Sequence, residues 1–171
     1  MTRALPSQSQ EEVTVMANTN IRRMANTPIQ VATLIVAAVF LLVGVLGFIP
    51  GITTNYDEME FAGHQSEAML LGIFQVSVLH NIVHLLFGVV GLIMARTAGL
   101  AKLYLIGGGI IYLVLWIYGL IVDQDAEANF VPVNDAVTWL HFVLGVGMIL
   151  LGVVLGRGVA ATTDSGADRR R

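Results

Sequence analysis

The sequence predicts an all-α integral membrane protein, a four-helix bundle with both termini in the cytoplasm. Of its 171 residues, 56% are hydrophobic and only 12% are charged, and the mean hydropathy is +0.76. A soluble domain carries about 25% charged residues, so this composition excludes a soluble domain and a disordered chain. Four apolar runs also approach or exceed the roughly 20 residues that a membrane-spanning helix needs.

The four apolar runs define one predicted membrane domain over residues 28–156. They occupy residues 29–49, 69–94, 103–122 and 137–155, and none of them contains Asp, Glu, Lys or Arg. A soluble helix bundle would show polar stripes with a period of 3.6 residues, and these runs do not. The charged residues are therefore expected only in the loops and tails.

Local signals place the ends of the runs. Pro28 suits the first turn of a helix, where its missing N–H costs nothing, and Pro50-Gly51 ends the first run. Ser66 with Glu67 can cap the start of the second run. Residues 1–27 are polar and predicted to form a flexible tail, in which Met1, Met16 and Met24 are alternative translation starts. Residues 157–171 are predicted to form a short cytoplasmic tail.

The distribution of charge predicts the orientation. All nine basic residues lie in the two tails and between the second and third runs: Arg3, Arg22, Arg23, Arg96, Lys102, Arg157, Arg169, Arg170 and Arg171. The other two loops carry acids instead: Asp57, Glu58, Glu60, Glu67, Asp123, Asp125, Glu127 and Asp135. Because basic loops stay inside, we expect a plasma-membrane protein with cytoplasmic termini and two acidic outer loops.

Small and polar residues share one face in three of the runs. Lipid gives helices no hydrophobic reason to associate, so close backbone approach at small residues holds them together. The predicted helix-packing residues of the second and fourth runs are Ser77, Asn81, Gly88, Gly91, Gly145, Gly152 and Gly156. The first run gathers Thr33, Ala37 and Gly44 in the same way. The third run contains Gly107-Gly108-Gly109 but no single stripe.

Three histidines are the candidate functional residues of the predicted membrane domain. His80 and His84 lie one turn apart on one face of the second run, with His80 near mid-membrane, and His141 lies in the outer part of the fourth. Three interpretations stay open: hydrogen bonds between helices, a site for haem b or a divalent metal, and a proton relay. A haem would need His141 on one face and His80 or His84 on the other, because two histidines one turn apart on the same helix cannot ligate both faces of one haem.

Several activities are disfavoured by missing residues. The chain has no cysteine, which excludes disulfides, thiolate metal sites and cysteine nucleophiles. The spacing of His80 and His84 resembles the zinc-protease motif, but Asn81 stands where the general base must be. The net charge of −3 and the lack of an internal basic stretch disfavour nucleic acid. We therefore expect no enzyme activity and no bound cofactor.

Four segments resemble one bacterial membrane family. They are TPIQVATLIVAAVFLLVGVLGFIPG, LLGIFQVSVLHNIVHLLFGVVGL, YLIGGGIIYLVLWIYGLIVDQ, and ANFVPVN followed by WLHFVLGVGMILLG. In this order they are similar to domain-of-unknown-function family 4383, common in actinobacteria, and the resemblance runs from about Thr27 to Arg157. It implies four membrane helices and a plasma-membrane location. It implies no activity, substrate or cofactor, so it assigns no role to the histidines.

These observations lead to a first hypothesis and two alternatives. The first is a non-enzymatic membrane protein that packs with itself as a homo-oligomer, or with other membrane proteins as an accessory component, in the lipid bilayer. The first alternative is a redox accessory protein that binds haem or a metal through His80, His84 and His141. The second alternative is a small transporter or channel-like protein whose acidic outer loops attract cations.

Overall fold

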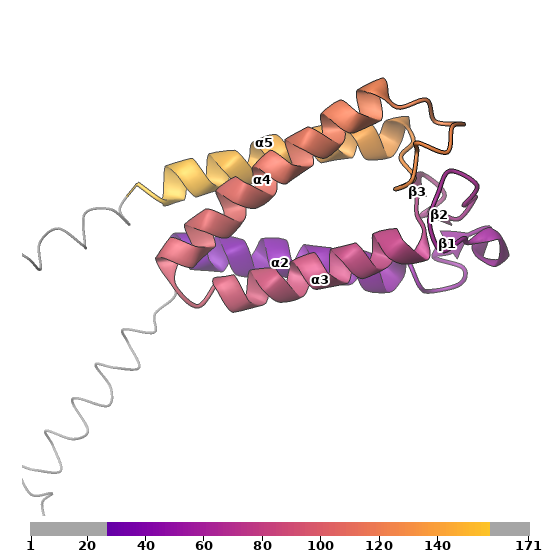
Figure 1. Ribbon diagram of the computed structural model, residues 1–171. Coiled ribbons are helices and arrows are strands. Elements are labelled where there is room, and N and C mark those ends of the chain that lie inside the picture. The colour runs from indigo at the N-terminus through magenta and orange to yellow at the C-terminus, as the bar shows by residue number, and fades with distance from the viewer. Residues whose placement is uncertain (1–26, 158–171) are drawn as a thin grey trace, which may run out of the picture.

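The computed structural model describes residues 27–157, which contain four α-helices and one small antiparallel sheet (Figure 1). The helices are α2 (Pro28–Leu46), α3 (Val78–Met94), α4 (Ala98–Ile121) and α5 (Asp135–Leu155). The strands are β1 (Thr53–Thr54), β2 (Met69–Leu70) and β3 (Phe74–Gln75), with a 3-10 turn η1 (Tyr56–Glu58) between β1 and β2. The predicted all-α class is confirmed. Apart from residues 27 and 157, the predicted tails and the alternative starts lie outside the described residues.

The helices have the length and composition of membrane spans. Helices α2, α4 and α5 are long and apolar enough to cross a membrane, and α3 is apolar but shorter. The 17 residues of α3 extend over about 26 Å at 1.5 Å per residue, slightly less than the roughly 30 Å of a hydrocarbon core. The chain is therefore a helical membrane protein, with one span shorter than the rest.

The predicted second span, residues 69–94, is wrong over its first part. Residues 69–75 form β2, a turn and β3, and the helix begins only at Val78. Leu71 and Gly72 at the turn have φ angles of 55° and 70°, which no right-handed helix contains. Ser77 ends the extended segment and caps α3, because its hydroxyl accepts the backbone N–H of His80 at 3.2 Å. Ser77 is thus a buried helix cap rather than a member of a helix-packing face.

The remaining boundaries shift by a few residues. Helix α2 ends at Leu46, α4 begins five residues earlier than predicted at Ala98, and α5 begins two residues earlier at Asp135. Asn134 caps α5 by accepting the N–H of Val137 at 3.0 Å. Ser66, the predicted cap of the second span, instead donates a hydrogen bond to the Val76 carbonyl at 2.6 Å. Lys102 and Asp135 consequently lie near the starts of helices, as the fifth residue of α4 and the first of α5, so charge is not wholly confined to loops.

The four helices pack as two pairs, α2 with α3 and α4 with α5 (Figure 1). The pairs lie closest where the α3–α4 turn joins them, which we call the turn end. They diverge toward the other end, where the sheet and residues 122–134 lie, which we call the sheet end. The predicted small-residue faces form these pairs: the buried residues include Asn81, Gly88, Gly91, Gly145, Gly152 and Gly156. The faces are therefore used within the chain.

Glycines set the short distance between helices α4 and α5. A Cβ placed on Gly109 would lie 2.7 Å from the Gly145 carbonyl oxygen, and one on Gly145 would lie 2.9 Å from that of Gly109. Both neighbours are backbone atoms, which cannot rotate away. The third span thus has a packing face after all, and its buried residues are Ala101, Tyr104, Leu105, Gly108, Gly109, Tyr112 and Gly119.

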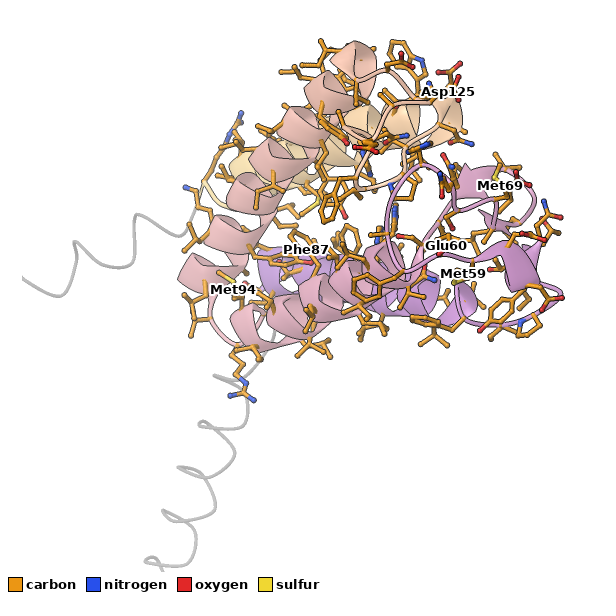
Figure 2. All side chains as sticks on the ribbon, turned by 45° about the vertical axis from the view of Figure 1, so that its right-hand side comes forward. Met59, Glu60, Met69, Phe87, Met94 and Asp125 are labelled. Atoms are coloured by element: carbon orange, nitrogen blue, oxygen red, sulfur yellow. The ribbon has the colours of Figure 1, made fainter. Side chains whose placement is uncertain are left out.

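Aromatic side chains join the two pairs. Phe87 of α3 lies between them in Figure 2, and its ring centre is 4.8 Å from Phe40, 5.0 Å from Tyr104 and 5.6 Å from Tyr112. These rings come from α2, α3 and α4. Aromatic contacts at such distances add about 0.5–1.5 kcal/mol each beyond the area they bury. These aromatic contacts therefore help to fix the position of one helix pair against the other.

The two acidic loops, residues 47–77 and 122–134, form a single cap over the sheet end. The Gly63 N–H donates to the Phe130 carbonyl at 2.8 Å and thereby links them. The side chain of Asn134 donates to the Ile73 carbonyl at 2.9 Å. Within the second loop, the fully buried amide of Asn129 bonds to the backbone of Gln124 and Val133. Hydrogen bonds thus hold the two loops of the cap together where it lies over the diverging helices.

Candidate binding site

The three predicted histidines lie near each other at the sheet end of the bundle. His80 and His84 are the third and seventh residues of α3, and His141 is the seventh residue of α5. Seven residues correspond to about 10 Å of helix, so His84 and His141 lie at similar depths below their helix ends. The mid-membrane position of His80 was expected from a helix that begins at residue 69, and this basis is wrong, because α3 begins at Val78 and His80 lies in its first turn.

His80 and His84 form a stacked pair whose hydrogen bonding fixes one tautomer. Their ring centres are 4.5 Å apart, and the planes differ by 5°. The Nδ1 atom of His84 lies 3.0 Å from the backbone carbonyl oxygen of His80. A carbonyl can only accept, so Nδ1 of His84 carries the hydrogen. In the neutral ring that suits an apolar setting, Nε2 of His84 is then a free hydrogen-bond acceptor.

Two aromatic residues connect this pair to His141. The Phe40 ring lies 5.6 Å from His84 and 5.3 Å from Tyr112. Tyr112 in turn meets His141 edge to face, with ring centres 5.2 Å apart and planes at 73°. Sequence analysis did not select Phe40 or Tyr112. Its spacing could have indicated Tyr112, which follows Gly108 by four residues and therefore lies on the same buried face of α4.

A recess of about 90 Å³ lies among these side chains. We call it the histidine recess, and its lining residues are His80, Val83, His84, Tyr112, Leu115, Val131 and His141. Helices α3, α4 and α5 contribute six of these residues, and the seventh, Val131, belongs to the cap. The cap and all helices except α2 therefore build this recess together.

Buried polar atoms without partners gather at the sheet end. In the described part of the chain they are His80 Nδ1, Asn81 Oδ1, Trp116 Nε1, Thr138 Oγ1 and His141 Nδ1. His80 and His141 are 6% and 3% exposed, and both line the histidine recess. Leaving a buried polar atom unpaired costs roughly 1–3 kcal/mol. Two residues of the histidine recess therefore have hydrogen-bonding capacity that no group of the described chain uses.

The arrangement fits neither of the cofactors considered from the sequence. Among residues 27–157, no group of three or more His, Asp or Glu side chains is arranged to hold a metal ion. His80 and His84 stack face to face rather than directing their nitrogens at a common point. The recess of about 90 Å³ is also far smaller than the roughly 300–1,000 Å³ of ordinary ligand pockets, and a haem is larger than most such ligands.

The acidic outer loops border a different recess. It has a volume of about 250 Å³ and is lined by Glu60, Ala62, Gly63, His64, Gln65 and Glu127. It shares no lining residue with the histidine recess. Figure 2 shows Glu60 and Asp125 in two separate loops of the cap. The acidic loops and the three histidines therefore border two separate recesses, and the structure does not join them into one path.

The fold and the site define this chain as a bundle of membrane-type helices with a recess, lined by three histidines, at one end. The family model described as Domain of unknown function (DUF4383) matches residues 30–154. The chain belongs to this family. No curated protein and no solved structure matches the chain.

Proposed function

We propose that this chain is a non-enzymatic membrane protein that binds one small, neutral molecule in the histidine recess. The observation that carries the proposal is that His80 and His141, each with one unpartnered ring nitrogen, both line the same recess. A bound molecule that hydrogen-bonds to them removes the cost of leaving them unpaired. The recess is lined by imidazole, phenol and aliphatic side chains and by no carboxylate, so a neutral molecule suits it better than a cation.

The location of the protein is part of the same proposal. We place it in the plasma membrane with both termini in the cytoplasm, because the basic residues lie in the tails and at the turn end while the cap is acidic. The histidine recess then lies in the outer half of the membrane. A molecule that partitions into the outer leaflet would reach it without crossing the bilayer.

Association with further copies, or with other membrane proteins, is a second proposal. The small-residue faces pack within the chain, so such contacts would use the outward-facing Leu, Val and Ile side chains. A groove of about 180 Å³ between α2 and α5, which includes Phe40, Leu144 and Gly147, favours this proposal. Gly147 has no atom within 4 Å of where its Cβ would lie, so the helix surface is open there.

The binding proposal is tested by asking what the purified protein retains. The full chain is purified from its native membrane in mild detergent, and its bound small molecules are extracted and identified by mass spectrometry. The variant His141→Phe keeps a ring of similar size but loses both nitrogens. We expect it to lose at least tenfold of any molecule held in the recess.

The matched control is His64→Phe, which changes a histidine of the outer cap that does not line the histidine recess. It should retain the same molecules as the wild type. Identical extracts from wild type and His141→Phe, with both proteins melting at similar temperatures, would contradict the proposal. If His141→Phe does not fold, Tyr112→Phe provides the second variant, because it removes only the hydroxyl at the recess.

A further inference from the structure

The hydrogen-bonding character of the histidine recess restricts the chemistry of its ligand. His84 uses its Nδ1 hydrogen on the His80 carbonyl, so its Nε2 atom can only accept. In the neutral ring this Nε2 atom carries a lone pair, and His84 lines the recess. His80 lines the recess as well, and its Nδ1 atom has no partner. The recess therefore offers the lone pair of His84 and calls for a ligand that donates hydrogen.

The walls of the recess restrict the shape of the ligand. The Tyr112 ring and the stacked imidazoles of His80 and His84 present flat surfaces, and aromatic rings pack on such surfaces at 4.5–7 Å. The volume of about 90 Å³ is smaller than the 150 Å³ cavity that holds a whole benzene molecule in another protein. The recess thus admits the leading edge of one ring, while the remainder of the molecule stays outside it.

The apolar lining of the recess indicates the direction of entry. Val83 of α3 is 46% exposed and Leu115 of α4 is half-buried, and both line the recess. They lie on neighbouring helices of the two diverging pairs, whereas Val131 of the cap covers the recess from the loop side. A molecule therefore enters between α3 and α4, from the hydrocarbon that surrounds the helices. Such a molecule needs an apolar body.

From these restrictions we infer that the histidine recess binds the hydroxyl-bearing edge of an aromatic ring, of the phenol or quinol class, that carries an apolar tail. This inference rests on the proposed function and adds the class of ligand. The ring hydroxyl donates to Nε2 of His84. The ring edge lies against Tyr112, and the tail extends between α3 and α4 into lipid. No bond is made or broken.

The test uses two probes that differ only at the ring oxygen, where the second carries a methyl group in place of the hydrogen that the first can donate. The full-length protein in phosphatidylcholine nanodiscs is titrated with 4-nonylphenol and, separately, with its methyl ether, 4-nonylanisole. Binding is followed through the nitrogen resonances of ¹⁵N-labelled histidine. We expect saturable binding of the phenol with a change at the His84 resonance, and at least tenfold weaker binding of the ether, because the ether cannot donate.

Variants connect the binding to the recess. His84→Phe should weaken binding of the phenol at least tenfold, and His141→Phe is the second variant if His84→Phe does not fold. The control His64→Phe should bind as the wild type does. Equal binding of phenol and ether, or equal binding to His84→Phe, would overturn the inference because it would show partition into lipid or into apolar grooves only.

The outcome also separates this inference from the proposed function. If the purified protein retains a small molecule through His141 but does not bind 4-nonylphenol, the recess is a binding site for another chemical class, and only the present inference is overturned. If it retains nothing and binds neither probe, both proposals are overturned.

Discussion

The two ends of the helix pairs treat their buried polar groups differently. At the turn end each one has a partner: Gln30 donates to the Ala95 carbonyl at 2.9 Å, Tyr104 to that of Phe87 at 3.2 Å, and Thr33 to that of Ile29 at 2.9 Å. At the sheet end, one buried atom has no partner in each of five side chains: His80, Asn81, Trp116, Thr138 and His141. These polar groups of the turn end are thus satisfied within the chain, whereas five buried polar atoms of the sheet end can each still form a hydrogen bond.

The difference has a structural cause in the divergence of the helices. Where the pairs meet, helix backbones approach closely and a side chain reaches a carbonyl of the neighbouring helix, as Gln30 does. Where the pairs diverge, the cap and larger side chains occupy the space, and the partners of the polar atoms lie too far away. Unpaired polar atoms are expensive in a protein interior. Their concentration at one end is therefore a feature that function explains better than packing does.

The largest effect is expected from an experiment that determines which end faces outward. The natural chain has no cysteine, so single cysteines can be introduced without background. Asp125→Cys lies in the exposed cap and Thr97→Cys in the exposed α3–α4 turn. In intact cells a membrane-impermeant maleimide should label the first almost completely and the second hardly at all, because basic segments stay inside.

Permeabilised cells provide the control, since both cysteines should then react. Labelling of Thr97→Cys in intact cells, with Asp125→Cys protected, would place the sheet end in the cytoplasm. The comparison between the two ends would survive such a result, but the route by which a ligand reaches the histidine recess would start from the inner leaflet.

The next effect concerns the close contact of α4 and α5. In Gly109→Ala the new methyl would lie 2.7 Å from the Gly145 carbonyl oxygen, and backbone must move to relieve the clash. Such overpacking costs about 1–3 kcal/mol. For a chain of this size each kcal/mol lowers the melting temperature by about 2–4 °C. Thermal unfolding in mild detergent, followed by circular dichroism, measures the change.

The matched control is two residues away on the same helix. Gly107 has no atom within 4 Å of where its Cβ would lie, so Gly107→Ala should leave the melting temperature unchanged, or raise it because alanine favours a helix by up to about 1 kcal/mol. A similar loss from both substitutions would mean that the contact between α4 and α5 does not limit stability.

Much of the fold could be predicted from the sequence, because hydrophobicity and small-residue periodicity act locally. The positions of α2, α4 and α5 followed from apolar length, and Gly88, Gly91, Gly145 and Gly152 were correctly placed on packing faces. The second span was predicted too long because Met69 to Val76 is as apolar as a helix. Gly72, which suits a turn, and Ser77, which suits a helix cap, lie within residues 69–94 and indicate that the helix begins after them.

The candidate site was only partly predictable. The three histidines were selected because imidazole is rare in an apolar run and needs a partner there. The contribution of Tyr112 and Phe40 depends on how α2 and α4 are rotated against α3, which no local pattern specifies. Val131 reaches the recess only because Asn129 folds the second loop back over the helices. Tertiary contacts of this kind have no signature in a single sequence.

The smallest expected effect compares the two ends directly, with one substitution made at each. Thr33 and Thr138 are both buried threonines, at the turn end and the sheet end respectively. The hydroxyl of Thr33 donates to the Ile29 carbonyl at 2.9 Å, whereas that of Thr138 has no partner. Valine has nearly the same shape without the hydroxyl. Thr33→Val should therefore lower the free energy of unfolding by about 0.5–1 kcal/mol, in the range measured for hydrogen bonds in membrane helices.

Thr138→Val should cost nothing, or add up to about 1 kcal/mol, because it removes a buried hydroxyl that no group satisfies. The measured quantity is the difference between the two variants in unfolding by denaturant in detergent. Equal losses would show that Thr138 finds a partner in the folded protein, and the contrast between a satisfied turn end and an unsatisfied sheet end would then fail at this position. A loss confined to Thr33→Val would confirm the contrast between the two ends at this pair of threonines.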